Sequence, residues 1–155
     1  MIGCFDTSAL VPLVIAEPGS IRCSELWNAC DQRLASMLVI AEGHAALAQA
    51  SRLGRLTPDE HENAAALLDL RIGELDLVLP ARQIVDSAAK LALQFGLRGY
   101  DAVHAATALS LSEDDVVAIT ADTDLLKALK ALGISTADPN NRPSATASQN
   151  RPARR

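Results

Sequence analysis

Short apolar segments alternate with longer amphipathic segments along most of the chain. The short segments favour buried strands at residues 1–5, 33–36, 75–79, 116–119 and 134–136. Between them, apolar residues recur at helical spacing, which predicts helices at residues 7–16, 20–30, 37–52, 57–71, 80–95, 101–111 and 125–132. Strands that alternate with helices in this way indicate an α/β fold with a mainly parallel central sheet.

Turn and capping residues mark the boundaries of several predicted elements. Thr57 followed by Pro58 is typical of a helix start, and Gly96 is placed to end a helix. From Asp138 onward the chain has no periodicity and is rich in Pro, Asn, Ser and Arg. We therefore predict one domain over residues 1–137 and a disordered tail over residues 138–155.

Composition narrows the class of protein further. The chain has 155 residues, of which 49% are hydrophobic and only 3% aromatic, so its core is expected to be aliphatic. It lacks an apolar run of about 18 residues and the basic start of a secretory signal. Three cysteines without a C-x-x-C motif favour neither a disulfide framework nor a zinc cluster. We therefore expect a cytoplasmic protein.

Charge is unevenly distributed. Residues 1–137 carry 10 basic and 18 acidic side chains, a net charge of −8, whereas the tail has four arginines and one acid. An acidic body does not favour nucleic-acid binding by charge alone. Either metal ions supply positive charge at a site, or a basic partner binds this surface.

Four acidic residues stand within apolar sequence, where an unpaired carboxylate is costly. Asp6 follows the first apolar segment, Glu42 lies inside Met37–Leu47, Asp101 opens an Ala-rich helix, and Asp122 follows Val116–Ala121. Each has an ordinary explanation when taken alone. Asp6, Asp101 and Asp122 are placed to cap helices, as is Asp124, and Glu42 would extend its carboxylate to solvent from the edge of a helix face.

The four together predict more than any one of them. Three stand at junctions that lead into helices, and in a parallel sheet such junctions can converge on one edge. Convergent carboxylates are the ligands that Mg²⁺ or Mn²⁺ prefers. A metal held in this way can activate water and stabilise charge on a phosphoryl oxygen, so the pattern favours phosphodiester hydrolysis.

The chain resembles the PIN-domain family, and within it the VapC toxins of bacterial toxin–antitoxin pairs. The resemblance covers about residues 1–137 and rests on four motifs in the family's order. They are Phe5-Asp-Thr-Ser-Ala-Leu10, Ala41-Glu42, Tyr100-Asp-Ala-Val-His-Ala-Ala-Thr-Ala108 and Ile119-Thr-Ala-Asp-Thr-Asp-Leu125.

The resemblance implies a three-layer α/β/α sandwich around a parallel sheet. It implies that Asp6, Glu42, Asp101 and Asp122 are catalytic and hold Mg²⁺ or Mn²⁺, with Asp124 as a further metal ligand. By the same resemblance, Thr7, Ser8 and Thr120 orient the substrate. The narrower resemblance to VapC toxins implies an endoribonuclease, usually a homodimer, that is inhibited by a small antitoxin with a basic C-terminal segment.

Other residues and other functions remain open from the sequence. His104 is either a catalytic base or a packed helix residue, and Arg98, near Asp101, is a candidate phosphate contact. The alternative functions are a catalytically weak PIN-like module that acts through its antitoxin complex in transcriptional autoregulation, a DNA nuclease, and a phosphatase of the haloacid dehalogenase type. That phosphatase chemistry needs a second Asp where this chain has Ser8.

Overall fold

The computed structural model describes residues 1–111 and 115–141. Five strands form the sheet: β1 (Ile2–Phe5), β2 (Gln32–Ser36), β3 (Asp76–Val78), β4 (Val116–Ile119) and β5 (Ser135–Ala137). The helices are α1 (Thr7–Leu10), the 3₁₀ turn η1 (Val11–Leu13), α2 (Ser20–Ala29), α3 (Val39–Arg52), α4 (Pro58–Gly73), α5 (Arg82–Phe95), α6 (Gly99–Ser110) and α7 (Thr123–Ala131). The predicted α/β fold is therefore confirmed.

All neighbouring strands of the sheet are parallel, and β1 lies at its centre in the order β3-β2-β1-β4-β5. Phe5, at the end of β1, stands opposite Ala35 of β2 and Ile119 of β4. The chain builds one half of the sheet from β1 to β3 and then crosses to build the other half. This reversal falls between β1 and β4, which is where open α/β sheets place their ligand sites.

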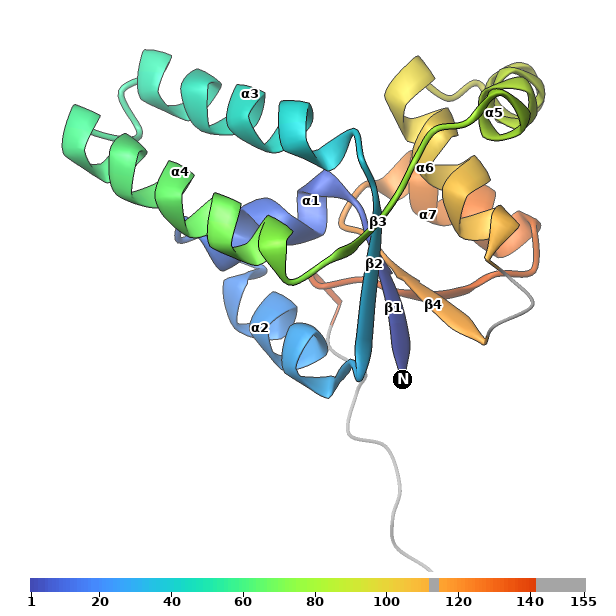
Figure 1. Ribbon diagram of the computed structural model, residues 1–155, viewed down its shortest axis with the longest axis horizontal. Helices are drawn as coiled ribbons and strands as arrows, with labels where there is room; N and C mark the ends of the chain where they lie inside the picture. Colours follow the sequence, from blue (N-terminus) through green and yellow to red (C-terminus); the bar gives the residue numbers. More distant parts are fainter. Residues whose placement is uncertain (112–114, 142–155) are drawn as a thin grey trace, which may run out of the picture.

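Helices cover both faces of the sheet, which gives three layers (Figure 1). Helices α1 to α4 lie on one side and α5 to α7 on the other. Successive residues of β1 face opposite layers, as the strand period of two requires. Cys4 packs into the cluster under α5, α6 and α7, whereas Phe5 packs into the cluster under α1 and α2.

Tight packing holds the centre of the sheet against α2. The rings of Phe5 and Trp27 lie 5.1 Å apart between centroids. Beside them, a Cβ added at Gly3 would come within 2.5 Å of the Cys30 Sγ atom, so only glycine fits at this point of β1. Helices α3 and α4 form a hairpin with a small core of its own at Leu47, Ala64 and Leu68.

Several helix boundaries differ from the predictions. The predicted helix at residues 7–16 is α-helical only to Leu10 and continues as η1, because Pro12 has no N–H to donate to a preceding carbonyl. Helix α5 starts at Arg82 rather than at Pro80, with Ala81 as its N-cap. Helix α6 starts at Gly99, so Arg98 and not Asp101 is its N-cap.

Other predicted boundaries are confirmed. Thr57 and Glu60 form a reciprocal capping box at the start of α4. Gly96 ends α5 in the left-handed conformation, with φ of 67°, which glycine adopts without strain. Residues 138–141 form a turn in which Pro139 is buried next to Gly19. The remainder of the predicted disordered tail lies outside the described residues, and so does the link at residues 112–114.

None of the helices in the described part of the chain has both the length and the apolar character needed to cross a bilayer.

Candidate active site

The four acids singled out in the sequence all line one pocket at the carboxyl edge of the sheet. Asp6 follows β1, Asp122 follows β4, and Glu42 and Asp101 lie in the first turns of α3 and α6. The pocket has a volume of about 360 Å³. Its ionisable lining residues are Asp6, Glu17, Glu42, Arg98, Asp101, His104 and Asp122. The sheet reversal therefore brings together side chains that are up to 116 positions apart.

Asp6 is the most enclosed of the four, with 7% of its surface exposed. It is the N-cap of α1 and accepts a hydrogen bond from the Ala9 backbone N–H at 3.2 Å. Ser8 donates to it at 2.7 Å and Thr120 at 2.8 Å. Burial raises the pKa of Asp6 above its usual value, against the lowering effects of His104 and of these hydrogen bonds. Asp6 is thus both a helix cap and a pocket carboxylate.

The two hydroxyl groups that contact Asp6 also connect β1 to the end of β4. The Ser8 Oγ atom accepts from the Ala121 N–H at 2.8 Å, and the Thr120 Oγ1 atom accepts from the Asp122 N–H at 3.0 Å. Asp122 in turn caps α7 through the N–H groups of Asp124 and Leu125. This network orients Asp6 and Asp122 toward the same pocket before any ligand is bound.

Glu42 is held by a histidine and a threonine from two other elements. His104 of α6 lies 2.6 Å from the Glu42 Oε2 atom, and Thr7 donates to the same oxygen at 2.9 Å. Burial alone would raise the pKa of Glu42, but His104 and Thr7 lower it below its usual value. Burial likewise acts to lower the pKa of His104, but Glu42, Asp6 and Asp101 raise it overall. Glu42 and His104 therefore form a hydrogen-bonded pair in which the pKa of each group is shifted toward its charged form.

In EDTA, His104→Gln is expected to destabilise the protein by about 1–2 kcal/mol more at pH 5.5 than at pH 9. The raised pKa of His104 contributes stability that is complete below its ordinary pKa of 6.5 and is lost as pH rises through the folded-state value. The lowered pKa of Glu42 contributes stability above its ordinary pKa of 4.5, which is lost toward lower pH. Urea unfolding at both pH values measures the difference.

The matched control is His44→Gln, which removes an exposed contact between His44 and Asp69 at 2.9 Å. An exposed pair of this kind is expected to contribute less than about 1 kcal/mol. Equal destabilisation of the His104→Gln variant at the two pH values would contradict a charged pair in the pocket.

Arg98 joins the other two carboxylates. Its Nε atom donates to Asp101 at 2.8 Å and one of its terminal nitrogens to Asp122 at 3.4 Å. The hydrogen bond to Asp101 and the charges of both acids raise the pKa of Arg98, so the guanidinium stays charged. Of the described residues, Arg98 and His104 are the cationic groups that line the pocket beside the carboxylates.

One predicted site residue is not brought into this pocket. Asp124 is two residues from Asp122, but its side chain is exposed and pairs with Lys127 at 3.0 Å. Two further ionisable residues line the pocket. Glu17 was not identified from the sequence, and His104, which the sequence left open between a catalytic base and a packed residue, is paired across the pocket with Glu42. The spacing of three between Asp101 and His104 was the available indication, because such residues share a helix face.

Comparison with known proteins identifies the family. A family model described as the PIN domain matches residues 3–131. The chain belongs to the PIN-domain family. The VapC resemblance is also confirmed, since the chain is 36% identical over 129 residues to Ribonuclease VapC45 of Mycobacterium tuberculosis, which covers 83% of this chain and 90% of that protein.

Solved structures share the same fold. VapC20 of Mycobacterium tuberculosis, described as a sarcin-ricin loop cleaving toxin, superposes with a TM-score of 0.65 at 18% identity, over 91% of this chain and 99% of that one. VapBC-5 of the same organism, a member of a family of toxin–antitoxin systems, gives a TM-score of 0.60 at 19% identity, over 88% and 98% of the two chains. Both likenesses confirm the three-layer PIN fold.

The pocket of this PIN domain has the donor chemistry for a hard divalent cation. Its carboxylate oxygens are of the type that Mg²⁺ and Mn²⁺ prefer, and Asp6, Glu42, Asp101 and Asp122 are the residues that would hold such an ion. Within residues 1–111 and 115–141, no three histidine, cysteine or carboxylate side chains already form a cage for a metal. Instead, the side chains of Arg98 and His104 contact these carboxylates.

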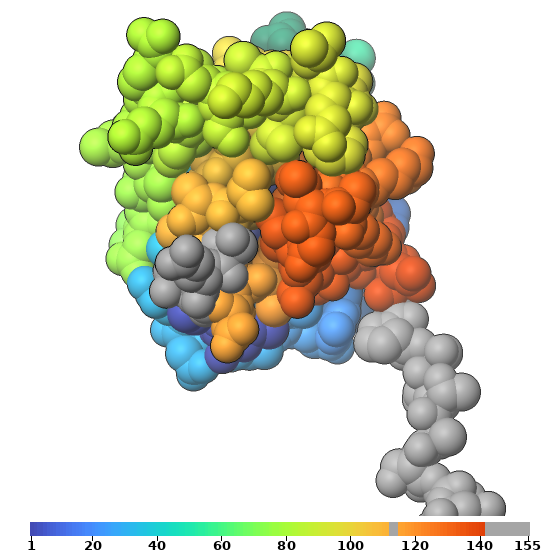
Figure 2. All heavy atoms as spheres, turned by 90° about the vertical axis from the view of Figure 1, so that its right-hand side faces the viewer, coloured from blue at the N-terminus to red at the C-terminus, as the bar shows by residue number. Residues whose placement is uncertain are grey.

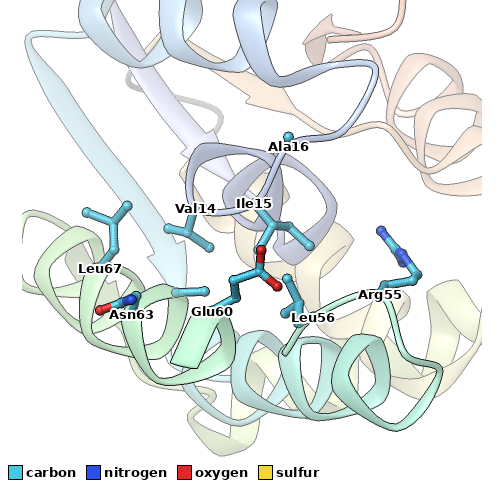
Figure 3. A pocket seen from close by; sticks show the side chains of 9 residues that line it. Val14, Ile15, Ala16, Arg55, Leu56, Glu60, Asn63 and Leu67 are labelled. Atoms are coloured by element: carbon cyan, nitrogen blue, oxygen red, sulfur yellow. The ribbon is translucent and has the colours of Figure 1, made fainter. Parts of the chain in front are cut away.

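A second pocket of this PIN domain, about 420 Å³ in volume, lies between the segment that follows η1 and the α3–α4 hairpin. Figure 3 shows side chains of the hairpin facing Val14 and Ile15 across it. Arg55, on its rim, donates to Glu17 at 2.8 Å, and Glu17 also lines the carboxylate pocket. The two pockets are therefore adjacent and share one ion pair as their boundary.

Proposed function

We propose that this PIN-domain protein is a Mg²⁺- or Mn²⁺-dependent endoribonuclease, the toxin component of a VapBC-type pair. The observation that carries the proposal is the convergence of Asp6, Glu42, Asp101 and Asp122 on one pocket at the sheet reversal. The 36% sequence identity to Ribonuclease VapC45 supports RNA as the substrate. Four carboxylates that line one pocket favour binding of a divalent cation. The cation would offset the repulsion among the carboxylates and between them and a phosphodiester.

A bound divalent ion supplies an activated water for in-line attack on phosphorus and neutralises charge on the phosphoryl oxygens. The protein's own contribution is to hold the carboxylates in place. Ser8 and Thr120 fix Asp6, and Thr7 and His104 fix Glu42. Because the pKa of Glu42 is lowered, it stays ionised at neutral pH and is better suited to carry charge than to store a proton.

Asp101→Asn is expected to reduce RNA cleavage by about 10²-fold or more, because several kcal/mol of charge stabilisation depend on the metal carboxylates. The assay is cleavage of a mixed RNA pool and of whole-cell tRNA and rRNA with Mg²⁺ or Mn²⁺, and with EDTA. Asp59→Asn is the matched control, because Asp59 also lies in the first turn of its helix but outside the pocket.

Loss of cleavage in EDTA and in Asp101→Asn, with activity retained in Asp59→Asn, is the result expected of a metal-dependent nuclease. If folded wild-type protein leaves every one of these RNAs intact, the nuclease assignment fails. The protein would then be a PIN-like module that acts through its antitoxin complex.

The antitoxin partner in this proposal binds across the two adjacent pockets. Apolar side chains of its C-terminal segment would occupy the pocket beside Val14 and Ile15, and a basic side chain would reach Glu17 and the carboxylates beyond it. The net charge of −8 over residues 1–137 favours a basic segment of this kind. Several solved structures with this fold are toxin–antitoxin complexes, which supports a partner of that class.

The homodimer in this proposal forms through α5 and α6. Figure 2 shows α5, in yellow-green, lying above α6 and α7 on the outer face of the molecule. An apolar groove of about 490 Å³ lies between α5 and the first half of α6, lined by Val85, Ala88, Ala92, Tyr100 and Val103 among others. Leu93, also on α5, is 89% exposed. Apolar surface of this extent on a helix pair is typical of a protein interface.

Sedimentation velocity tests both partners in one measurement. The protein alone is expected to sediment as a dimer at micromolar concentration and Val85→Glu as a monomer, because a buried charge opposes closure of the groove. Addition of a candidate antitoxin, encoded by a small open reading frame found directly upstream of the gene, is expected to give a larger complex with either form. A wild-type monomer would contradict the dimer, and unchanged sedimentation on addition would contradict the antitoxin.

A further inference from the structure

Arg98 is the side chain that connects two of the pocket's carboxylates from separate elements. It contacts Asp101 of α6 at 2.8 Å and Asp122, the N-cap of α7, at 3.4 Å. In residues 1–111 and 115–141, each other salt bridge of an arginine or lysine side chain joins that cation to a single carboxylate residue. The guanidinium of Arg98 therefore offsets negative charge on two acids that line the same pocket.

The exposure of the three partners is unequal. The Arg98 side chain is 80% exposed, whereas Asp101 is 15% and Asp122 28% exposed. Arg98 is also the N-cap of α6 and makes no side-chain capping bond to that helix. The two acids are thus fixed by the fold, while the arginine reaches them from solvent along a flexible stem. Its contacts can break without unfolding of either helix.

Arg98 contacts the Oδ2 atom of each carboxylate, and a divalent cation in the pocket would compete for these oxygens. An oxygen that accepts a hydrogen bond from a guanidinium binds a metal ion less tightly, so the two cations compete. A doubly charged ion close to both carboxylates is favoured over a singly charged, solvated guanidinium once it has lost part of its hydration shell.

We propose that Arg98 is a displaceable counterion: it holds Asp101 and Asp122 in the metal-free protein, releases them when a divalent cation binds, and then contacts a phosphate of the RNA. This proposal rests on the proposed nuclease function. The release leaves the guanidinium at the mouth of the pocket, on the side that the substrate must approach. Arginine forms paired hydrogen bonds with phosphate oxygens, so the freed side chain is suited to position the RNA backbone.

The test measures Mn²⁺ binding and RNA cleavage separately. Wild-type protein, Arg98→Gln and Arg98→Lys are titrated with Mn²⁺ by calorimetry, and single-turnover cleavage is measured at saturating Mn²⁺. The control is Arg82→Gln, because Arg82 forms an exposed pair with Asp86 on α5, away from the pocket. The Arg98→Lys variant keeps the charge but cannot form the arginine fork.

Arg98→Gln is expected to bind Mn²⁺ about three- to tenfold more tightly than wild-type protein, as loss of two partly exposed ion pairs implies. At saturating Mn²⁺ it is expected to cleave RNA about tenfold or more slowly, with Arg98→Lys between the two and Arg82→Gln unchanged. A merely structural arginine would not separate metal affinity from cleavage in opposite directions.

Equal or weaker Mn²⁺ affinity in Arg98→Gln, with normal binding by wild-type protein, overturns the role of Arg98 and leaves the nuclease assignment intact. Tighter Mn²⁺ binding with unchanged cleavage overturns the phosphate contact. Failure of both wild-type protein and Arg98→Gln to bind Mn²⁺ overturns the proposed metal-dependent function, and the role of Arg98 with it.

Discussion

Asp6→Asn is expected to reduce the rate of RNA cleavage by about 10²-fold or more. The same variant is expected to raise the melting temperature of the metal-free protein. The loss of activity follows because Asp6 stands at the centre of the carboxylate pocket, at the end of β1. The gain in stability follows from burial, which raises the pKa of Asp6 and makes its ionised form unfavourable in the folded protein. Asparagine carries no charge and can still accept the Ala9 N–H.

The gain is expected to depend on pH. A carboxyl group with a raised folded-state pKa loses no stability at low pH, where it is protonated in both states. As pH rises past its ordinary pKa of 3.8, the unfolded chain releases the proton first, and the folded wild-type protein becomes relatively less stable. The difference in melting temperature between Asp6→Asn and wild type in EDTA should therefore be larger at pH 8 than at pH 5.

Scanning calorimetry and the RNA cleavage assay measure the two effects on the same preparations. Thr120→Val is the informative companion variant, because it keeps side-chain shape but removes the hydroxyl that donates to Asp6 at 2.8 Å. It is expected to destabilise the protein at pH 8. A melting temperature of Asp6→Asn that falls below wild type at pH 8 would show that the ionised carboxylate stabilises the metal-free fold, contrary to this prediction.

Phe5→Ala is expected to lower the free energy of unfolding by about 3–5 kcal/mol. Phe5 has no exposed surface, lies in the central strand and packs against Trp27 on the α2 side of the sheet. Its removal leaves a cavity that neighbouring strands cannot close without breaking their ladders. At about 2–4 °C per kcal/mol for a chain of this size, the melting temperature should fall by roughly 6–20 °C. Urea unfolding and calorimetry measure both quantities.

Two variants bracket this result. Phe5→Leu fills part of the cavity and is expected to lose clearly less stability than Phe5→Ala. Leu93→Ala removes an 89% exposed side chain and is expected to change stability by no more than about 0.5 kcal/mol in the monomer. A loss of less than about 1 kcal/mol in Phe5→Ala would contradict the packing of β1 described above. Because Asp6 follows Phe5 directly, cleavage is also expected to weaken at temperatures well below the transition.

Much of the architecture was predictable because local pattern and global fold agree in this chain. Apolar runs such as Val116–Ile119 are buried on both faces of a parallel sheet, and the capping residues Thr57 and Gly96 act where they stand in the sequence. The predicted helix boundaries were wrong where a proline or a capping residue, rather than apolar periodicity, sets the end of the helix. Pro12 interrupts a helix whose apolar residues still recur at the expected spacing, and the cap of α6 is set three residues before the acid that seemed to supply it.

The sequence by itself determined which four acids to consider, because burial of a carboxylate within apolar segments is unfavourable unless the group is paired, hydrogen-bonded or bound to a metal. Only the tertiary structure decided their partners. His104 meets Glu42 across 62 positions, and Arg98 meets Asp122 across 24. Asp124 is exposed although it is two residues from Asp122, which is the N-cap of α7 and lines the pocket. Strand order brings the distant partners together, and it arises from contacts between distant segments that no local pattern records.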